Sequence, residues 1–135
     1  MRLSPPEIEA FLQEPHTLVL ATIRADGTPH LSTVWYRWDG EAFWIATNRD
    51  RVKFRNIERD ARVAVLVDAA ARETSVSANG EASVAARGDE AYDGARSIVA
   101  RYVDDPDGYL RDRAGEPRVL LRIRPDRMSS WTLSR

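Results

Sequence analysis

The sequence predicts a mainly β fold, an antiparallel barrel with a few short helices. Six strand-like segments rich in β-branched and aromatic residues are spread along the 135 residues. Two hairpin signals, residues 25–28 and Asp39-Gly40, join the first three segments into a meander. The longer helical pattern comes late in the chain, so helices do not alternate with strands as a parallel βαβ sheet requires.

The strand patterns fall at six places, with residues 128–133 as a candidate for a short last strand. The six are residues 16–24, 29–38, 41–48, 61–68, 74–86 and 117–124. Gly80 stands inside the fifth strand pattern, which predicts a bulge or a close approach of another group.

Three helices are expected between these strands. Ser4 and Glu7 form a capping box with Pro5 at the first helical position, and Pro15 ends this helix. A second short helix covers residues 50–59 with Asp50 as its N-cap. The third covers residues 89–103, where apolar residues recur at helical spacing, and the segment 104–108 breaks it.

The length fits one domain, which we assign to residues 1–135. The composition is 43% hydrophobic and 30% charged, as in globular proteins. The 20 basic and 21 acidic residues give a net charge of −1, which disfavours broad nucleic-acid binding.

The residue types in the chain argue against disulfides, most metal sites, a membrane span and secretion. The chain has no cysteine, which excludes disulfides, cysteine-ligated zinc and iron–sulfur clusters, and its two histidines are too few for most histidine metal sites. No apolar run approaches the roughly 20 residues of a membrane span. The N-terminus has no apolar signal-peptide region, so we expect a cytoplasmic protein.

Three cations, Arg49, Arg51 and Lys53, cluster at the start of the second helix. The helix dipole disfavours a cation there by roughly 0.3–1 kcal/mol each, whereas the free backbone N–H groups favour an anion. A bound phosphate would reverse the sign of that penalty. The alternative is a solvated basic face, offset by nearby acidic residues.

Three further segments are candidates for ligand contacts, and each has a plainer interpretation. Ser32 and Thr33 could hydrogen-bond a heterocycle, and Trp35 or Tyr36 could pack on a ring, or these aromatics belong to a core or dimer interface. Trp131 covers a ligand or anchors the tail. The arginines of the sixth strand form a solvated edge or meet an anionic ligand tail; they are Arg118, Arg122 and Arg124.

Acid–base machinery is sparse in this sequence. His16 and His30 both lie at strand starts, and no paired carboxylates stand at a spacing typical of a catalytic site. The sequence also lacks a glycine-rich phosphate loop of the dinucleotide or P-loop type. If the protein is an enzyme, its chemistry belongs to a bound cofactor.

The stretch LATIRADGTPHLSTVWYRWDGEAFWIATNRDRVKFRNIERDARVAVLVD resembles the flavin/deazaflavin split-barrel superfamily, whose namesake is pyridoxamine 5′-phosphate oxidase. It is most similar to the short branch that uses the deazaflavin coenzyme F-420. The likeness extends from the first helix to the SSW tail and lies in the order and spacing of several short pieces.

The resemblance implies a six-stranded Greek-key split barrel that forms a homodimer, with two cofactor sites in grooves between the protomers. It assigns Arg51 and Lys53 to the cofactor phosphate, with Asn56 one helical turn further on. The remaining residues that match cofactor-binding positions are Thr47 and Asn48 at the strand end, Ser32, Thr33 and Val34 along the ring, and Trp131 in the tail.

The sequence also departs from the namesake oxidase. Ser32 stands where that enzyme has an arginine, Arg37 takes the place of its lysine, and Val52-Lys53 replaces an arginine–lysine pair. The longer C-terminal region that helps to bind the vitamin substrate is missing. Oxidation of pyridoxamine phosphate is therefore not expected.

These observations together predict an oxidoreductase that uses reduced coenzyme F-420 to transfer hydride to a small organic acceptor. One alternative is an FMN-binding flavoprotein of the same superfamily, because both cofactors carry a phosphate and a tricyclic ring. The other is a non-catalytic flavin or deazaflavin carrier or sensor, which the sparse acid–base machinery keeps open.

Overall fold

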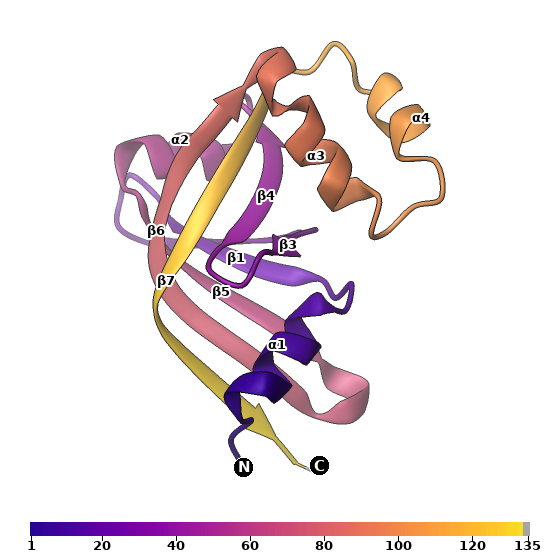
Figure 1. Cartoon of the computed structure of the whole chain (residues 1–135). Helices are drawn as coiled ribbons and strands as arrows, with labels where there is room; N and C mark the ends of the chain where they lie inside the picture. The colour runs from indigo at the N-terminus through magenta and orange to yellow at the C-terminus, as the bar shows by residue number, and fades with distance from the viewer. Residues whose placement is uncertain (134–135) are drawn as a thin grey trace.

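The computed structural model describes residues 1–133, and its body is one antiparallel sheet in the strand order β2-β1-β5-β6-β7-β4-β3 (Figure 1). The strands are β1 (Leu18–Ile23), β2 (Pro29–Val34), β3 (Arg37–Trp38), β4 (Phe43–Asn48), β5 (Arg62–Ala69), β6 (Thr74–Arg87) and β7 (Arg118–Thr132). The helices are α1 (Pro5–Gln13), α2 (Val52–Arg59), α3 (Tyr92–Val99) and α4 (Pro106–Arg111), with short 3-10 turns η1 (Ala70–Arg72) and η2 (Gly88–Ala91).

The two edge strands of this sheet, β2 and β3, are consecutive in the chain and separated by Trp35 and Tyr36 alone. Because a linker of two residues spans only about 10 Å, the sheet must curl until its edges meet. One face is thereby enclosed, and alternate residues of the strands fill it. The largest fully buried side chains of this interior are Tyr36, Phe43, Phe54, Leu12, Leu18, Leu20, Ile45, Val67, Val76, Leu121 and Ile123.

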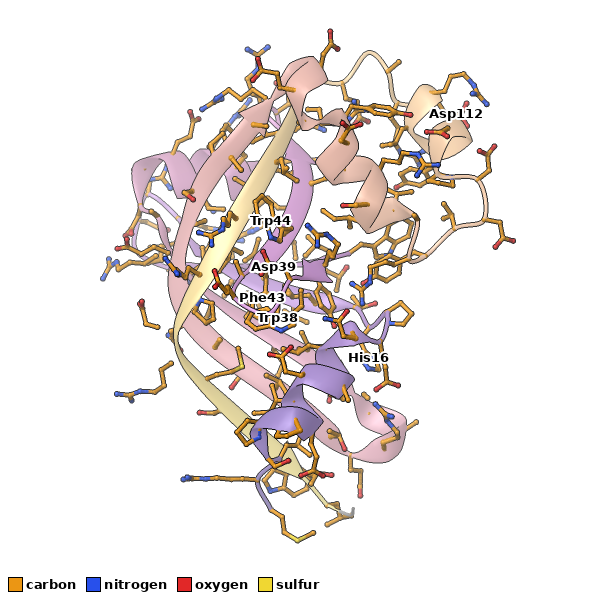
Figure 2. The ribbon with its side chains drawn as sticks, in the orientation of Figure 1. His16, Trp38, Asp39, Phe43, Trp44 and Asp112 are labelled. Atoms are coloured by element: carbon orange, nitrogen blue, oxygen red, sulfur yellow. The ribbon has the colours of Figure 1, made fainter. Side chains whose placement is uncertain are left out.

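Helix α1 covers one end of the curled sheet and begins with the predicted capping box. The Glu7 amide donates to Ser4 Oγ at 3.3 Å, and the Ser4 amide donates to Glu7 Oε1 at 2.9 Å. Phe11 and Leu12 face the interior. Trp38 packs on Phe43 with ring centroids 4.6 Å apart, in the middle of the molecule (Figure 2).

Helices α3 and α4 lie outside the sheet, in the long connection from β6 to β7 (Figure 1). Ile98 packs with Leu120 of β7, and Val99 packs with Leu110 of α4. Arg101, just after α3, donates to the carbonyls of Leu12, Gln13 and Glu14 at the end of α1 and to that of Tyr36. The connection that contains α3 and α4 is therefore attached to the C-terminal end of α1.

The mainly antiparallel β fold is confirmed, but the predicted count of six strands is wrong, since there are seven. The predicted strand 29–38 is interrupted at residues 35–36, where the chain passes from one sheet edge to the other. The segments 117–124 and 128–133 are one strand, β7. Its Pro125 lies opposite Gly80, where the register shifts, and a bulge tolerates a residue without an N–H.

The predicted helix over residues 89–103 was too long, since it divides into η2 and α3. The segment predicted to break that helix, residues 104–108, instead contains the start of α4. Asp105 caps α4 by accepting from the Gly108 amide at 3.0 Å, and Pro106 takes the first helical position. Across residues 1–133, no helix has both the length and the apolar character needed to cross a membrane.

Candidate functional site

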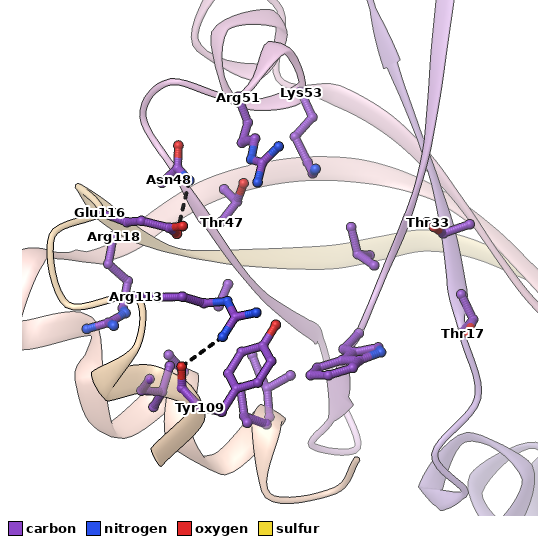
Figure 3. A pocket seen from close by; sticks show the side chains of 17 residues that line it. Thr17, Thr33, Thr47, Asn48, Arg51, Lys53, Tyr109, Arg113, Glu116 and Arg118 are labelled. Atoms are coloured by element: carbon purple, nitrogen blue, oxygen red, sulfur yellow. Dashed lines mark hydrogen bonds between the residues drawn. The ribbon is translucent and has the colours of Figure 1, made fainter. Parts of the chain in front are cut away.

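A cavity of about 460 Å³ opens where β2, β4, the start of α2 and the α3–α4 connection meet (Figure 3). This volume lies in the usual range for small-molecule sites. The lining residues are Thr17, Thr33, Val34, Trp35, Ala46, Thr47, Asn48, Arg51, Lys53, Ala95, Ile98, Val99, Tyr109, Leu110, Arg113, Glu116 and Arg118.

Four cations converge on this pocket: Arg51, Lys53, Arg113 and Arg118. None of them forms an ion pair with a carboxylate within residues 1–133. Glu116 is the single acidic residue among the lining side chains, and it accepts instead from Asn48 Nδ2 at 3.3 Å. Four cations that gather without ion-pair partners, beside a single carboxylate, favour an anionic ligand.

The start of α2 strengthens this preference. Arg51 occupies the N-cap position, and no side chain caps the first turn, so the prediction of Asp50 as the cap is wrong. The helix begins later than predicted because Asn48 fixes a tight turn before it. The Asn48 Oδ1 atom accepts from the Asp50 amide at 2.9 Å. The N-terminal end of α2 therefore reaches the pocket without a carboxylate of its own.

Lys53 is half-buried at this helix start. Burial and, to a smaller extent, the charge of Arg51 lower the pKa of its ammonium group from the usual 10.5. Both causes disfavour the charged form, and an anion beside Lys53 would oppose both. A phosphate-bearing ligand beside Lys53 would therefore offset the cost of keeping its ammonium group charged.

The opposite wall of the pocket is aromatic. Trp35 stacks on Tyr102 with centroids 4.8 Å apart and planes 5° from parallel. On the pocket side the ring centroids of Tyr109 and Trp35 are 5.3 Å apart, and the Arg113 guanidinium lies 3.6 Å from the Tyr109 ring centroid. This cation–π contact and a hydrogen bond from Arg113 Nη1 to the Tyr109 carbonyl at 2.9 Å hold the arginine in place (Figure 3).

Strand pairing brings these walls together. Asn48, the last residue of β4, pairs with Arg118, the first residue of β7. The Arg49 amide also donates to the Pro117 carbonyl at 3.0 Å. The start of α2 and the loop after α4 therefore meet at one point, although more than 50 residues separate them in the chain.

The structure gathers six of the nine predicted cofactor residues in this pocket: Thr33, Val34, Thr47, Asn48, Arg51 and Lys53. The other three lie outside it. Ser32 pairs with Leu20 and shares its inward face, and its Oγ is buried without a hydrogen-bond partner among residues 1–133. For Ser32 a cofactor contact stays a prediction.

Asn56 and Trp131 also lie away from the pocket. Asn56 is buried, donates from Nδ2 to Thr22 Oγ1 at 3.0 Å and accepts from Arg59 at 2.8 Å, so it attaches α2 to β1. Trp131 is 49% exposed and pairs with Ser75, at the end of β7 opposite to Arg118. Their roles toward a cofactor remain predictions as well.

The wall that α4 and its following loop provide, with Tyr109, Arg113 and Glu116, was not predicted from the sequence. A signal for this wall was present, because Asp105-Pro106 is an N-cap followed by a proline at the first helical position. The sequence indicates Arg118 only as one of three arginines on a strand face, with Arg122 and Arg124. Of those three arginines, Arg122 and Arg124 instead lie 3.8 Å from Glu41.

The arrangement suits a phosphorylated ring compound: cations and a free helix end at one side, aromatic and aliphatic side chains at the other. No three carboxylate or imidazole groups gather as metal ligands in the part of the chain that the structure describes. A cofactor placed in this pocket would meet side chains suited to binding and orienting it.

Comparison with known proteins gives a consistent picture. The sequence profile described as Pyridoxamine 5'-phosphate oxidase matches residues 4–132. A conserved hypothetical protein, Rv2991, from Mycobacterium tuberculosis aligns with a TM-score of 0.80 and 31% identity over 96% of this chain and 85% of that one. A protein described as an F420 reductase aligns with a TM-score of 0.73 and 30% identity over 90% of this chain and 94% of its own.

The fold is also shared by HutZ, the heme storage protein from Vibrio cholerae, with a TM-score of 0.73 and 24% identity over 98% of this chain and 95% of that one. The split barrel expected from the sequence is confirmed by these likenesses, with seven strands in place of six. On the profile match over nearly its whole length, the chain belongs to the pyridoxamine 5′-phosphate oxidase family.

Proposed function

We propose that the protein is an oxidoreductase that binds coenzyme F-420 in this pocket and passes hydride from the reduced cofactor to a small organic acceptor. The observation that carries the proposal is the group of cations at the uncapped start of α2, where Arg51 and Lys53 lack carboxylate partners within residues 1–133. The 30% identity to a protein described as an F420 reductase supports the choice of cofactor.

The residues present fit such a group. Arg51, Lys53 and the first amides of α2 would hold the phosphate, while Thr33, Val34 and Thr47 would lie along the ring. The cofactor, when bound, supplies the hydride chemistry. The chain's own part is to bind, orient and shield it from water, which apolar residues such as Ile98 and Leu110 favour.

The working form that we propose is a homodimer in the cytoplasm. The outer face of β2, β1 and β5 exposes apolar residues, with Leu31 at 65% and Leu66 at 38% exposure. Thr33 belongs to the same outer face and also lines the pocket. A second copy seated on this face would therefore also cover the mouth of the pocket.

Equilibrium titration of the purified protein with oxidised coenzyme F-420 and, separately, with FMN tests the proposal, with cofactor fluorescence as the readout. We expect the deazaflavin to bind more tightly than FMN. Failure of both to bind would remove the proposal, and a preference for FMN would move the protein to the flavin-binding members of the family.

The variant Lys53→Ala tests the phosphate contact. Loss of a charge-assisted hydrogen bond weakens cofactor binding by about 1–3 kcal/mol. Arg55→Ala is the matched control, because Arg55 is an exposed cation on the same helix and does not line the pocket. Equal affinity of wild type and Lys53→Ala would contradict the assignment.

Turnover distinguishes the enzyme from a non-catalytic carrier or sensor. We expect the reduced deazaflavin complex to be oxidised by a quinone or an unsaturated ketone. Tight cofactor binding without oxidation by any acceptor would favour the carrier.

A further inference from the structure

Four tyrosines are present, and three of them use their hydroxyl groups inside the fold. Tyr36 donates to the carbonyls of Leu12 and Glu14, at 2.9 and 3.1 Å. Tyr92 donates to Asp107 Oδ1 at 2.6 Å. Tyr102 donates to the His16 carbonyl at 2.6 Å.

Tyr109 differs from these three. It lines the pocket, and its hydroxyl forms no hydrogen bond with any residue that the structure describes, whereas its ring is well fixed. Trp35 lies on one side at 5.3 Å, and Arg113 lies 3.6 Å from the ring centroid. The Tyr109 amide also donates to the Asp105 carbonyl at 3.1 Å, which holds Tyr109 within α4.

The pocket contains few other groups that could give a proton to a ligand. Its three threonine hydroxyls are weak acids, and the cations are arginines and Lys53, which we assign to the phosphate. Figure 3 shows the Tyr109 hydroxyl directed into the open part of the pocket, away from the backbone of α4. A fixed ring with an unused hydroxyl is suited to contact a bound substrate.

We infer that Tyr109 is the residue that hydrogen-bonds the acceptor and gives it a proton as it is reduced. The inference rests on the proposed function. For an α,β-unsaturated ketone, hydride from the reduced cofactor brings two electrons and one hydrogen to the carbon–carbon double bond. The O–H bond of Tyr109 breaks as its proton forms a C–H bond at the carbon next to the carbonyl, and a proton from the solvent then restores the hydroxyl.

The first test uses the protein without cofactor. Tyrosine labelled at its Cζ carbon gives four magnetic resonance signals, which single Tyr→Phe variants assign. Adding cyclohexenone should shift the Tyr109 signal and leave those of Tyr36, Tyr92 and Tyr102 in place. An unmoved Tyr109 signal at saturating ketone would overturn the inference.

The second test compares Tyr109→Phe with Tyr92→Phe. The first keeps the ring between Trp35 and Arg113 and removes only the hydroxyl, while the second removes a hydroxyl already bound to Asp107 outside the pocket. In Tyr109→Phe, deazaflavin affinity should stay within about twofold, while single-turnover reduction of cyclohexenone slows by about a hundredfold or more. The solvent deuterium isotope effect on that step should also change.

Tyr92→Phe should reduce the ketone at close to the wild-type rate. Wild-type turnover by Tyr109→Phe would overturn the inference and leave the proposed function standing. Absence of deazaflavin binding by the wild-type protein would overturn both.

Discussion

At the scale of single residues, Gly80 is required by the close approach of two backbones. A Cβ built at this position collides with the Arg124 carbonyl oxygen on β7, which is backbone and cannot move aside as a side chain would. The register shift beside Gly80 is the bulge that the sequence predicted from a glycine inside a strand pattern.

Gly80→Ala should therefore lower the free energy of unfolding by about 1–3 kcal/mol, as overpacking does in a tight interior. Urea unfolding of the purified variant measures this. Gly115→Ala is the control, because a Cβ there meets nothing within 4 Å and its φ is not positive. That variant should be neutral or more stable by about 0.5 kcal/mol. Equal stability of the two variants would contradict the proposed clash.

In our proposal the charge of Lys53 favours binding of the cofactor phosphate but lowers the stability of the folded protein. Its pKa is lowered in the folded protein, so between that value and 10.5 the unfolded chain binds more protons than the folded one. Stability then rises with pH through this window, and at neutral pH the charged Lys53 costs free energy.

Lys53→Met should make the unliganded protein more stable at neutral pH, and the difference from wild type should shrink as pH rises toward 10.5. Urea unfolding at a series of pH values measures this difference directly. Reduced stability of Lys53→Met at pH 7 would show that Lys53 contributes a favourable contact within the protein itself.

At the scale of elements, the α3–α4 connection depends on one arginine. Arg101 donates to three carbonyls at the end of α1, which that helix leaves without internal partners, and its guanidinium lies 4.8 Å from the Tyr36 ring centroid. A charged donor is well suited to this place because the carbonyl end of a helix attracts cations. Arg101 thus joins the pocket wall to the N-terminal helix.

Arg101→Met should destabilise the protein by about 1–3 kcal/mol, since it removes charge-assisted hydrogen bonds to the helix-end carbonyls, although those of Leu12 and Glu14 keep the Tyr36 hydroxyl as a donor. Arg24→Met, at an exposed turn, should change stability by less than about 0.5 kcal/mol. Chemical denaturation gives both values. Hydrogen exchange should further show that the amides of α3 and α4 lose protection before those of β5 and β6.

Elements with strong local signals were predictable, and those determined by distant partners were not. Ser4 and Glu7 mark α1, and Arg51 and Lys53 mark the cationic end of the pocket, because each signal lies within one helical turn. The continuity of β7 through Pro125 depends on Gly80 of another strand, which no local pattern reveals. Helix α4 was missed for a different reason: its N-cap residues also resemble a helix break.

At the scale of the whole molecule, two rows of residues cross the outside of the sheet. One row contains Thr33, Val19, Leu66, Ser77 and Ser129, each paired with the next across adjacent strands. The second contains Leu31, Ala21, Ala64, Asn79 and Arg127. Apart from Asn79 and Arg127, these side chains are small or apolar, which is typical of a surface that packs against another protein.

The homodimer that we propose would use this face, and Leu31→Glu tests it. Leu31 is 65% exposed, so a carboxylate there is tolerated by the monomer but would be buried without a partner in a dimer. We expect the dimer dissociation constant, measured by analytical ultracentrifugation, to rise about a hundredfold with an unchanged circular dichroism spectrum.

Val84→Glu is the matched control for the dimer, because Val84 is an exposed apolar residue of β6 outside both rows. It should leave the association unchanged. Cofactor titration of the two variants then shows whether the pocket is complete in one protomer. If the partner covers the mouth beside Thr33, Leu31→Glu should bind coenzyme F-420 more weakly at concentrations where it is monomeric, and raising its concentration should restore the affinity. A monomer that binds the cofactor as tightly as the wild-type protein would place the whole site within a single chain.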